Sequence, residues 1–368
     1  MMKVTLANQT KTYELREHLR QEILRGKWQV GDRLPTEADI RTQYGVSNTT
    51  VREAVLGLVN DGLLERRRGS GTYVCKTHTP MITVVGTLDM FAAPVCTYYR
   101  NLLDAIQREV ADNGYTNALC IGSGDDEEDF AQATQVFYRN FRKQSTGVLS
   151  VMSLRDLGEY LSELQIPHVS IVHHKEDFGS SVVLDYRELI RQGIGVFFDA
   201  GIENIAVFIA EGKEALQNRR AKGRILRWFR ECGLFIPEDW IIAVPQDCVQ
   251  KARDELKDIW QSDHRPEGLF VLDDTVCDIV LATITELEIT VPDDLAVISA
   301  SNAGKEFYFP VPLTQIFWEP DLLASTAWGM LQKQIHEHNV ARETKMIPPQ
   351  LSMGESVVNP QNMSRVNR

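Results

Sequence analysis

Apolar residues recur at helical spacing near the start of the chain. Leu15, Leu19 and Ile23 stand four residues apart, so they share one face of a predicted first helix. A second helix is predicted to open near residue 35, because proline suits the first turn of a helix and the spacing of Thr36 and Asp39 is typical of a capping box.

The segment from residue 45 to residue 58 predicts a third helix with two different faces. Ser47 is a favourable N-cap, and the apolar residues after it gather on one side of the helix. Asn48, Thr49 and Arg52 point to the other side. A hairpin with a basic, glycine-rich tip is predicted at residues 63–74. Three helices followed by a hairpin form an α+β winged helix-turn-helix, a fold that presents its recognition helix to the major groove of DNA.

From residue 81 onwards, short apolar runs alternate with amphipathic segments. Strands are expected at residues 81–86, 116–121, 147–151, 166–172, 205–209, 240–244, 268–272, 295–300 and 350–353. Helices are expected at residues 98–112, 128–144, 154–164, 186–200, 219–232, 249–261, 276–287 and 321–337, with a crossover at 181–185. This alternation predicts an α/β domain of parallel sheets with helices on both faces. More than ten such units exceed one sheet, so we expect two lobes, with ligands beyond the carboxyl ends of the strands.

Length and charge support this division. A chain of 368 residues is too long for one ordinary core. Residues 1–80 carry 13 basic and 9 acidic residues, a net charge of +4, whereas the remainder carries 26 and 42, a net charge of −16. A basic head on an acidic body fits a DNA-binding module fused to a domain that does not touch DNA. We therefore expect a DNA-binding domain at 1–76, a linker at 77–81, a two-lobed domain at 82–355 and a polar tail at 356–368.

The composition offers little support for a metal site, a membrane anchor or an enzyme. The six cysteines are scattered and predict free thiols, and we expect neither a metal nor a cofactor. The chain has no signal-like start and no apolar run long enough to span a membrane, so we expect a cytoplasmic protein. It also has no nucleophile elbow, Walker-type loop or dinucleotide-binding glycine motif.

Three motifs in register resemble the GntR-type winged-helix head, namely residues 31–37, 46–54 and 62–74. By itself the basic run at 66–68 is typical of a solvated surface, and Thr49 and Thr50 could be ordinary helix surface. Their position after a capped turn and around a glycine-rich hairpin favours DNA binding. The resemblance implies DNA contacts from Arg33, Thr36, Ser47, Asn48, Thr49, Thr50, Arg52, Arg68, Gly69 and Ser70.

Two positions depart from the GntR pattern. Ala38 and Asn48 stand where the family usually carries arginine. Arginine favours guanine and asparagine favours adenine, so we expect an operator that differs from the common family consensus at the base read by residue 48.

The body resembles the LacI/GalR regulators and their periplasmic-binding-protein core. The resemblance rests on residues 98–99, 113–115, 147–149, 166–169, 220–223, 266–274, 291–298 and 312–314. It implies two lobes joined by three crossovers, an effector in the cleft between them, and a homodimer. The fusion of these two parts resembles that of arabinose-repressor-like regulators.

By position, the resemblance implies effector contacts from Arg220 and Asp274, a cleft-lining aromatic at Tyr98, and Asp185 at the first crossover. Tyr99 and Trp318 are further candidates for lining the cleft, which completes the expected effector site. Arginine and aspartate can bind vicinal hydroxyls while an aromatic ring packs on a sugar face, so we expect a sugar or a similar polyol. Each residue has a plainer alternative. Arg220 could pair with a nearby glutamate, either tyrosine could be core, Asp274 could cap a helix, and Trp318 could pack between the lobes. Isoleucine at 202 and Ser301-Asn302 also depart from the usual pattern.

These observations predict an effector-controlled transcription regulator, a repressor rather than an activator. It would bind a pseudo-palindromic DNA operator as a homodimer and would not be an enzyme. The enzymatic alternative is a pyridoxal-phosphate aminotransferase-like body, which would need a Schiff-base lysine; the lysines of the body show no such setting.

Overall fold

The computed structural model describes residues 2–24, 27–75, 80–87, 90, 96–122, 127–142, 144–152, 155–173, 179–211, 215–245, 249–337 and 340–358. The chain divides into two compact units. The first unit comprises Met1–Ile82 and Val110–Ala118, and the second comprises Thr83–Glu109 and Leu119–Arg368.

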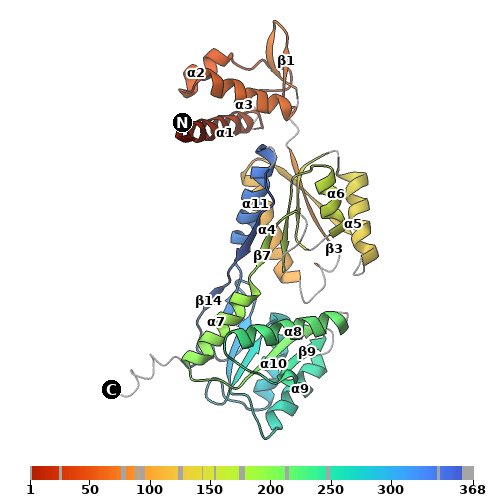
Figure 1. Cartoon of the computed structure of the whole chain (residues 1–368), viewed down its shortest axis with the longest axis vertical. Helices are drawn as coiled ribbons and strands as arrows, with labels where there is room; N and C mark the ends of the chain where they lie inside the picture. Colours follow the sequence, from red (N-terminus) through yellow and green to blue (C-terminus); the bar gives the residue numbers. More distant parts are fainter. Residues whose placement is uncertain are drawn as a thin grey trace, which may run out of the picture. The chain divides into compact units, whose positions relative to one another are not determined.

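The first unit begins with the predicted winged helix-turn-helix, which the structure confirms (Figure 1). Its elements are α1 (Met2–Leu24), α2 (Glu37–Tyr44), α3 (Asn48–Asn60), β1 (Leu64–Arg67) and β2 (Gly71–Val74). The predicted capping box of Thr36 and Asp39 is present, and Gly45 ends α2 at a φ of 64°. Helix α1 starts well before Leu15, because residues 2–12 hold several good helix formers and no helix breaker.

The apolar faces of the three helices form the core of this head. Leu19, Ile23, Val51 and Leu58 are all at most 1% exposed. The two strands pair antiparallel, and the preceding loop joins them: the Leu34 amide donates to the Thr72 carbonyl over 2.9 Å. The hairpin is therefore held on one side by the same loop that leads into α2.

Residues 110–118 belong to the first unit and contact α1. Arg20 is 1% exposed, and its Nη1 donates to the Tyr115 hydroxyl over 2.8 Å. The guanidinium carbon lies 4.4 Å from the centroid of the Tyr115 ring, and Glu17 lies 3.4 Å from the same Nη1. Burial raises the pKa of the Tyr115 phenol, which therefore stays protonated at neutral pH.

The second unit contains two six-stranded sheets, except for the first residues of β3 and β4, which belong to the first unit. The first sheet has the order β13-β7-β6-β5-β3-β4. Its strands are β3 (Met81–Thr87), β4 (Thr116–Gly122), β5 (Ser145–Ser150), β6 (His168–Val172), β7 (Ser180–Leu184) and β13 (Thr344–Ile347). The helices of this lobe are α4 (Cys96–Asp112), α5 (Glu127–Asn140), α6 (Arg155–Glu163) and α11 (Pro320–His336).

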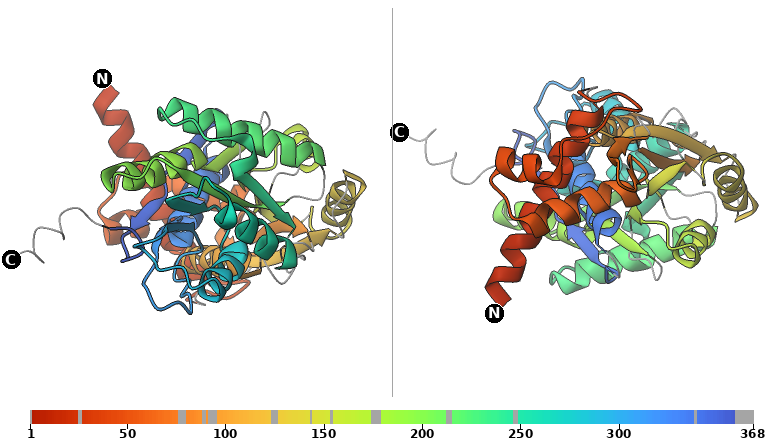
Figure 2. Two further views of the ribbon diagram at one scale, coloured as in Figure 1. Left: turned by 90° about the horizontal axis from the view of Figure 1, so that it is seen from below. Right: turned by 90° about the horizontal axis from the view of Figure 1, so that it is seen from above.

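The second sheet has the order β14-β12-β11-β10-β8-β9, and only β14 is antiparallel to its neighbour. Its strands are β8 (Ile205–Glu211), β9 (Ile241–Pro245), β10 (Gly268–Val271), β11 (Ala296–Ala300), β12 (Thr314–Phe317) and β14 (Gln350–Ser352). Its helices are α7 (Tyr186–Asp199), α8 (Ala215–Glu231), α9 (Val249–Gln261) and α10 (Asp274–Glu286), with a short 3-10 turn at Glu238–Trp240. Helices lie on both sides of the strands (Figure 2).

Helix α7 packs closely on the second sheet. A Cβ on Gly193 would lie 2.3 Å from Cζ of the buried Phe270 ring, whereas a Cβ on Gly195 would meet nothing within 4 Å. Glycine at 193 therefore sets how near α7 comes to β10.

The chain passes between the two sheets three times, as expected. The connections lie between β7 and α7, between β12 and α11, and between β13 and β14. They are tied together, since the Trp318 indole donates to the Ile347 carbonyl over 2.9 Å and the Asp185 amide donates to the same carbonyl over 3.0 Å. This pattern is a two-lobed α/β fold with mostly parallel strands.

Three details of the expected body are wrong. Residues 181–185, expected as a crossover, are mostly strand β7, whose residues are all buried. Strands β12 and β13 were not anticipated at all. β12 is only four residues long, and β13 has three exposed residues, so neither carries a clear apolar pattern. Both are defined by their pairing with other strands: β12 lies between β11 and β14, and β13 pairs with β7.

The C-terminal residues that are described belong to the second lobe. Ser356 is buried; its hydroxyl donates to the Val297 carbonyl and accepts from the Thr314 amide over 2.8 Å. Val357 is 3% exposed. Residues 359–368 lie outside the described part of the chain.

Candidate DNA-binding surface and effector site

The start of α3 is built to present side chains outward. The Ser47 hydroxyl accepts from the Thr50 amide over 3.1 Å and shares a 2.8 Å hydrogen bond with the Thr50 hydroxyl. Thr50 is only 2% exposed, so its side chain helps to hold the turn and faces inward. Asn48, Thr49 and Arg52 are exposed on the other face, as the sequence predicts.

The wing carries three arginines in different settings. Arg66 pairs with Glu37 over 2.7 Å, and Arg67 lies 4.4 Å above the Tyr73 ring and contacts Glu65. Arg68, by contrast, is exposed and makes no ion pair or hydrogen bond within the described residues. The basic run is therefore divided between two internally paired side chains and one that extends to solvent.

The wing tip follows the predicted turn chemistry. Gly69 has a φ of 73°, in the left-handed region that favours glycine. Ser70 is exposed, and its hydroxyl shares a 2.7 Å hydrogen bond with the Tyr73 hydroxyl. Arg68, Gly69 and Ser70 thus lie together at the exposed end of the hairpin.

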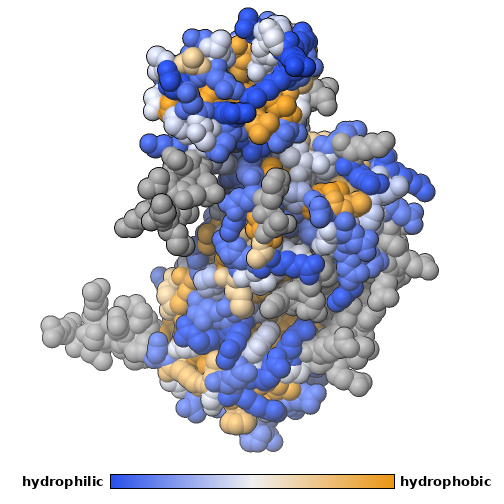
Figure 3. Space-filling model, turned by 45° about the horizontal axis from the view of Figure 1, so that its top comes forward, coloured by the Kyte–Doolittle hydropathy of each residue, from blue (hydrophilic) through white to orange (hydrophobic). Residues whose placement is uncertain are grey.

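Two further residues with predicted DNA contacts, Arg33 and Thr36, lie just before α2: Arg33 in the loop that supports the hairpin, and Thr36 at the N-cap of the helix. Arg33 is exposed and bridges to Tyr73 through the backbone. The Thr36 hydroxyl caps α2 by accepting from the Asp39 amide over 3.2 Å, and it donates to the Asp39 carboxylate over 2.6 Å. Figure 3 shows hydrophilic side chains over much of the head, interrupted by apolar patches. Four exposed arginines of the head have no ion-pair or hydrogen-bond partner among the described residues: Arg33, Arg41, Arg52 and Arg68.

A cavity of about 240 Å³ in the second unit lies at the carboxyl ends of strands from both sheets. Leu184 ends β7, Ala300 ends β11, and Leu272 follows β10 directly. Its lining consists of Tyr98, Tyr99, His173, Leu184, Tyr186, Leu272, Asp273, Asp274, Thr275, Ala300, Ser301, Asn302 and Trp318. This is the position at which parallel α/β folds place ligands.

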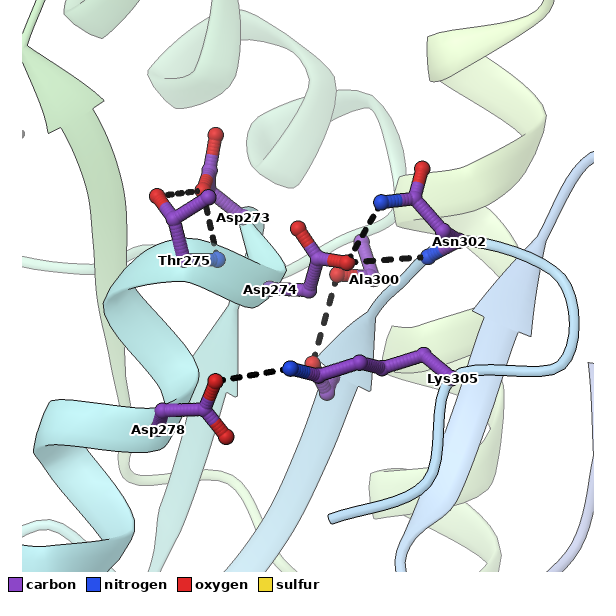
Figure 4. A network of polar contacts seen from close by, with 8 residues as sticks. Asp273, Asp274, Thr275, Asp278, Ala300, Asn302 and Lys305 are labelled. Carbon is purple, nitrogen blue, oxygen red and sulfur yellow. Dashed lines mark hydrogen bonds and ion pairs between the residues drawn. The ribbon is translucent and has the colours of Figure 1, made fainter. Parts of the chain in front are cut away.

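Two adjacent aspartates at the start of α10 have different roles (Figure 4). Asp273 is the N-cap, and its carboxylate accepts from the Thr275 amide over 2.9 Å. Asp274 accepts from the side-chain amide of Asn302 over 2.6 Å and from its backbone amide over 3.3 Å. Burial, reinforced by the neighbouring Asp273, raises the pKa of the Asp274 carboxyl. The Asp273 carboxylate therefore caps the helix, and the Asp274 carboxylate is available beside the cavity.

Aromatic side chains form the rest of the cavity wall. The ring centroids of Tyr98 and Tyr99 lie 5.1 Å apart, and those of Tyr186 and Trp318 lie 4.8 Å apart. His173 shares a 2.9 Å hydrogen bond with the Tyr186 hydroxyl. Because the Trp318 nitrogen is engaged with the Ile347 carbonyl, the ring of Trp318 is the part that faces the cavity. Carboxylate, amide and ring faces in one cavity suit a ligand with both hydroxyls and apolar faces.

The structure brings together four of the six predicted effector residues, namely Tyr98, Tyr99, Asp274 and Trp318. Asp185 caps α7, accepting from the Glu188 amide over 3.0 Å, and lines a neighbouring cavity instead. Arg220 lies on α8, but its side chain is outside the described residues.

Sequence reasoning missed Tyr186, His173, Asp273 and Asn302 as cavity residues. Each follows a strand end: Tyr186 comes two residues after β7, His173 one after β6, Asp273 two after β10 and Asn302 two after β11. The rule that ligands sit at strand ends could have found them. No group of three or more potential metal ligands occurs in the described part of the chain.

Comparison with known proteins agrees with both parts of this architecture. A family profile described as bacterial regulatory proteins, gntR family, matches residues 11–74, and one described as periplasmic binding protein-like domain matches residues 194–357. The arabinose metabolism transcriptional repressor of Geobacillus stearothermophilus is 22% identical over 358 residues, which cover 90% of this chain and 92% of that protein. The mannosyl-D-glycerate transport/metabolism system repressor MngR of Escherichia coli (strain K12) is 46% identical over 61 residues, 17% of this chain and 25% of that repressor.

Solved structures show the same fold. The transcriptional regulator CelR in complex with cellobiose has a TM-score of 0.60 at 17% identity, covering 86% of this chain and 94% of that chain. A LacI family transcriptional regulator from Enterococcus faecium with bound ribose has a TM-score of 0.57 at 20% identity, covering 76% of this chain and 99% of that chain.

The fold and the relatives define a DNA-binding transcription regulator. Its head matches the gntR family of bacterial regulatory proteins and its body matches the periplasmic binding protein-like domain. Two arabinose metabolism transcriptional repressors resemble this chain over 84% and 90% of its length. The aminotransferase-like alternative finds no support in these relatives, which are regulators. In the described part of the chain, none of the helices combines the length and the apolar character needed to cross a bilayer.

Proposed function

We propose that this protein is a repressor whose operator binding is controlled by a sugar in the cavity of the second unit. The observation that carries the proposal is the cavity itself, where Asp274 and Asn302 face a group of aromatic rings. Carboxylate and amide groups bind vicinal hydroxyls, and the rings pack on the apolar face of a pyranose or furanose. The names of the relatives, which refer to arabinose metabolism and to bound cellobiose and ribose, support the same ligand class.

DNA binding would use the exposed start of α3 and the wing tip. Asn48, Thr49 and Arg52 would read base edges and phosphates in the major groove, and Arg68 with Gly69 would reach the minor groove. Ser47 and Thr50 would act by holding the first turn of α3. We propose further that the protein works in the cytoplasm as a homodimer on a pseudo-palindromic operator, since two-fold symmetric proteins match two-fold symmetric sites.

Control would follow from differential affinity. A sugar that binds one arrangement of the two lobes more tightly shifts the population toward that arrangement, by no more than the difference in binding free energy. We propose that this shift lowers the affinity of the heads for the operator. A two-state linkage of this kind is reciprocal, so operator DNA should weaken sugar binding by the same factor.

Two measurements test the proposal on the full chain. A thermal-shift panel of arabinose, ribose, glucose, galactose and cellobiose should include at least one sugar that raises the melting temperature, because a ligand at a hundred times its Kd adds about 2.7 kcal/mol. That sugar should then release operator DNA in a fluorescence-anisotropy titration. Failure of every sugar to stabilise the protein, with a stabilising ligand from another chemical class, would overturn the sugar assignment.

Point variants separate the two functions. Arg52→Ala should weaken operator binding and leave the sugar-induced thermal shift unchanged. Asp274→Ala should leave operator binding in the absence of sugar unchanged and remove the thermal shift; Arg220→Ala should behave in the same way if Arg220 contacts the effector. If Arg52→Ala and Asp274→Ala lost the same function, this result would contradict the division of labour.

A further inference from the structure

A second cavity adjoins the proposed effector site. It has a volume of about 460 Å³, against about 240 Å³ for the first. The two cavities share five wall residues, which are His173, Leu184, Tyr186, Leu272 and Asp273. Because the same side chains line both, a ligand in the first cavity is next to the second.

The chemistry of the second cavity differs from that of the first. Nine of the described side chains in its lining are apolar, supplied by β7, α7, β8, α8, the end of β10 and β13: Val183, Leu184, Ile190, Ile209, Ala210, Ile225, Trp228, Leu272 and Met346. Its polar groups are mostly engaged elsewhere. Asp185 caps α7, and Arg187 pairs with Glu231 over 2.9 Å. The interior therefore offers apolar surface and few hydrogen-bond partners to an occupant.

Two side chains in the lining suit a flat aromatic group. Arg224 and Trp228 are four residues apart on α8 and so lie on the same face of that helix. Arg224 is exposed and has no ion-pair or hydrogen-bond partner among the described residues. An aromatic ring between them would stack on the indole and meet the guanidinium over its face. A second sugar ring would leave its hydroxyls unpaired against the aliphatic residues of this cavity.

From these observations we propose that the effector is an aryl glycoside, with its sugar in the first cavity and its aromatic aglycone in the second. This inference rests on the proposed function, because it needs a sugar in the first cavity. It adds the chemical class of the group attached to that sugar. Burial of a phenyl-sized group contributes about 1.5–3 kcal/mol, so the aglycone should raise affinity about tenfold to a hundredfold over a methyl glycoside.

The test compares matched ligands on the full-length protein by isothermal titration calorimetry. Methyl and phenyl glycosides of β-D-glucose, β-D-galactose and α-L-arabinose serve as probes. For the sugar that binds, the phenyl glycoside should bind about tenfold to a hundredfold more tightly than the methyl glycoside. Equal affinities, or tighter binding of a disaccharide of the same sugar than of its phenyl glycoside, would overturn the aglycone assignment while leaving the sugar site intact.

Two variants locate the aglycone without touching the first cavity. Trp228→Ala should remove most of the phenyl advantage and leave methyl glycoside affinity unchanged. Thr344→Trp fills the mouth of the second cavity from the exposed strand β13 and should have the same effect, with Thr344→Ser as its control. Since Thr344 is exposed, this variant keeps the test valid even if Trp228→Ala impairs folding. A phenyl advantage that survives Thr344→Trp would overturn the proposal.

The sugar-site hypothesis and the aglycone hypothesis would fail with different experimental results. If no glycoside and no free sugar binds, the sugar-controlled function itself is wrong and the inference falls with it. If phenol binds together with the methyl glycoside without competition and a phenyl glycoside gains nothing, the second cavity is a separate site and only the aglycone proposal is overturned.

Discussion

The salt dependence of operator binding gives a quantitative test of the proposed DNA surface. Four exposed arginines of the head have no ion-pair or hydrogen-bond partner among the described residues: Arg33, Arg41, Arg52 and Arg68. Each cation that neutralises a phosphate contributes about −0.9 to the slope of log K against log salt concentration. Four such contacts in each of the two heads of the proposed homodimer predict a slope of about −7.

Arg52→Ala should reduce this slope by about 1.8 for two heads, one phosphate contact being lost in each. Between 50 and 200 mM salt that difference corresponds to roughly 12-fold in relative affinity. Arg52→Lys keeps the charge, so it should keep the slope while losing the planar, two-pronged geometry that arginine offers to guanine or phosphate. Fluorescence anisotropy with a labelled operator at four or five salt concentrations measures both quantities.

A matched control comes from the other unit of the chain. Arg227 is an exposed arginine on α8, and Arg227→Ala removes the same charge from the acidic body. Its slope should equal that of the unmodified protein. If Arg52→Ala and Arg227→Ala changed the slope equally, the effect would reflect net charge alone, and the assignment of α3 as the reading helix would lose its support. An unchanged slope in Arg52→Ala would show that residue 52 makes no phosphate contact.

Three further predictions concern stability. Gly193→Ala should lower the free energy of unfolding by about 1–3 kcal/mol, because its Cβ meets a buried ring, whereas Gly195→Ala on the same helix should raise it by about 0.5–1 kcal/mol; urea denaturation compares the two. Because the pKa of Asp274 is raised, the folded state holds the carboxyl proton more tightly than the unfolded state does. The protonated carboxyl therefore contributes its full stabilisation at a pH below the ordinary pKa near 3.8, and this stabilisation is lost as the pH rises through the pKa of the folded state. Asp274→Asn should remove that part of the pH dependence, and urea midpoints measured between pH 4 and 7 that move in parallel for the two proteins would contradict it. Tyr115→Phe should cost about 1–3 kcal/mol, since it leaves the buried Arg20 donor without its hydroxyl partner while the ring contact stays; a thermal melt within error of the unmodified protein would refute this.

Local signals in the sequence predicted local structure well. The caps formed by Thr36 and Ser47 are present, and the alternation of apolar runs with amphipathic segments led to the two-lobed α/β domain. Strand β13 escaped prediction because most of its side chains are exposed and it is a strand only through its pairing with β7. The same limit applies to the site. Asp185 and Asp274 both stand close to the end of a strand. Only the three-dimensional arrangement shows that Asp185 caps α7 beside the larger cavity, whereas Asp274 lines the proposed effector cavity.

The cavity is built where the chain passes between the lobes, and this bears on how binding could be transmitted. Tyr186 follows the first crossover and Trp318 stands at the second. The Trp318 indole is hydrogen-bonded to the Ile347 carbonyl at the third crossover, which also accepts from the Asp185 amide at the first. A ligand packed on the rings of Tyr186 and Trp318 therefore contacts residues of the crossovers directly. The affinity of such a ligand must depend on the arrangement of those crossovers. A ligand can shift a conformational equilibrium only if its affinity differs between the two conformations. A ligand bound within one lobe alone would have no such dependence, so the placement of these two rings favours control through the crossovers.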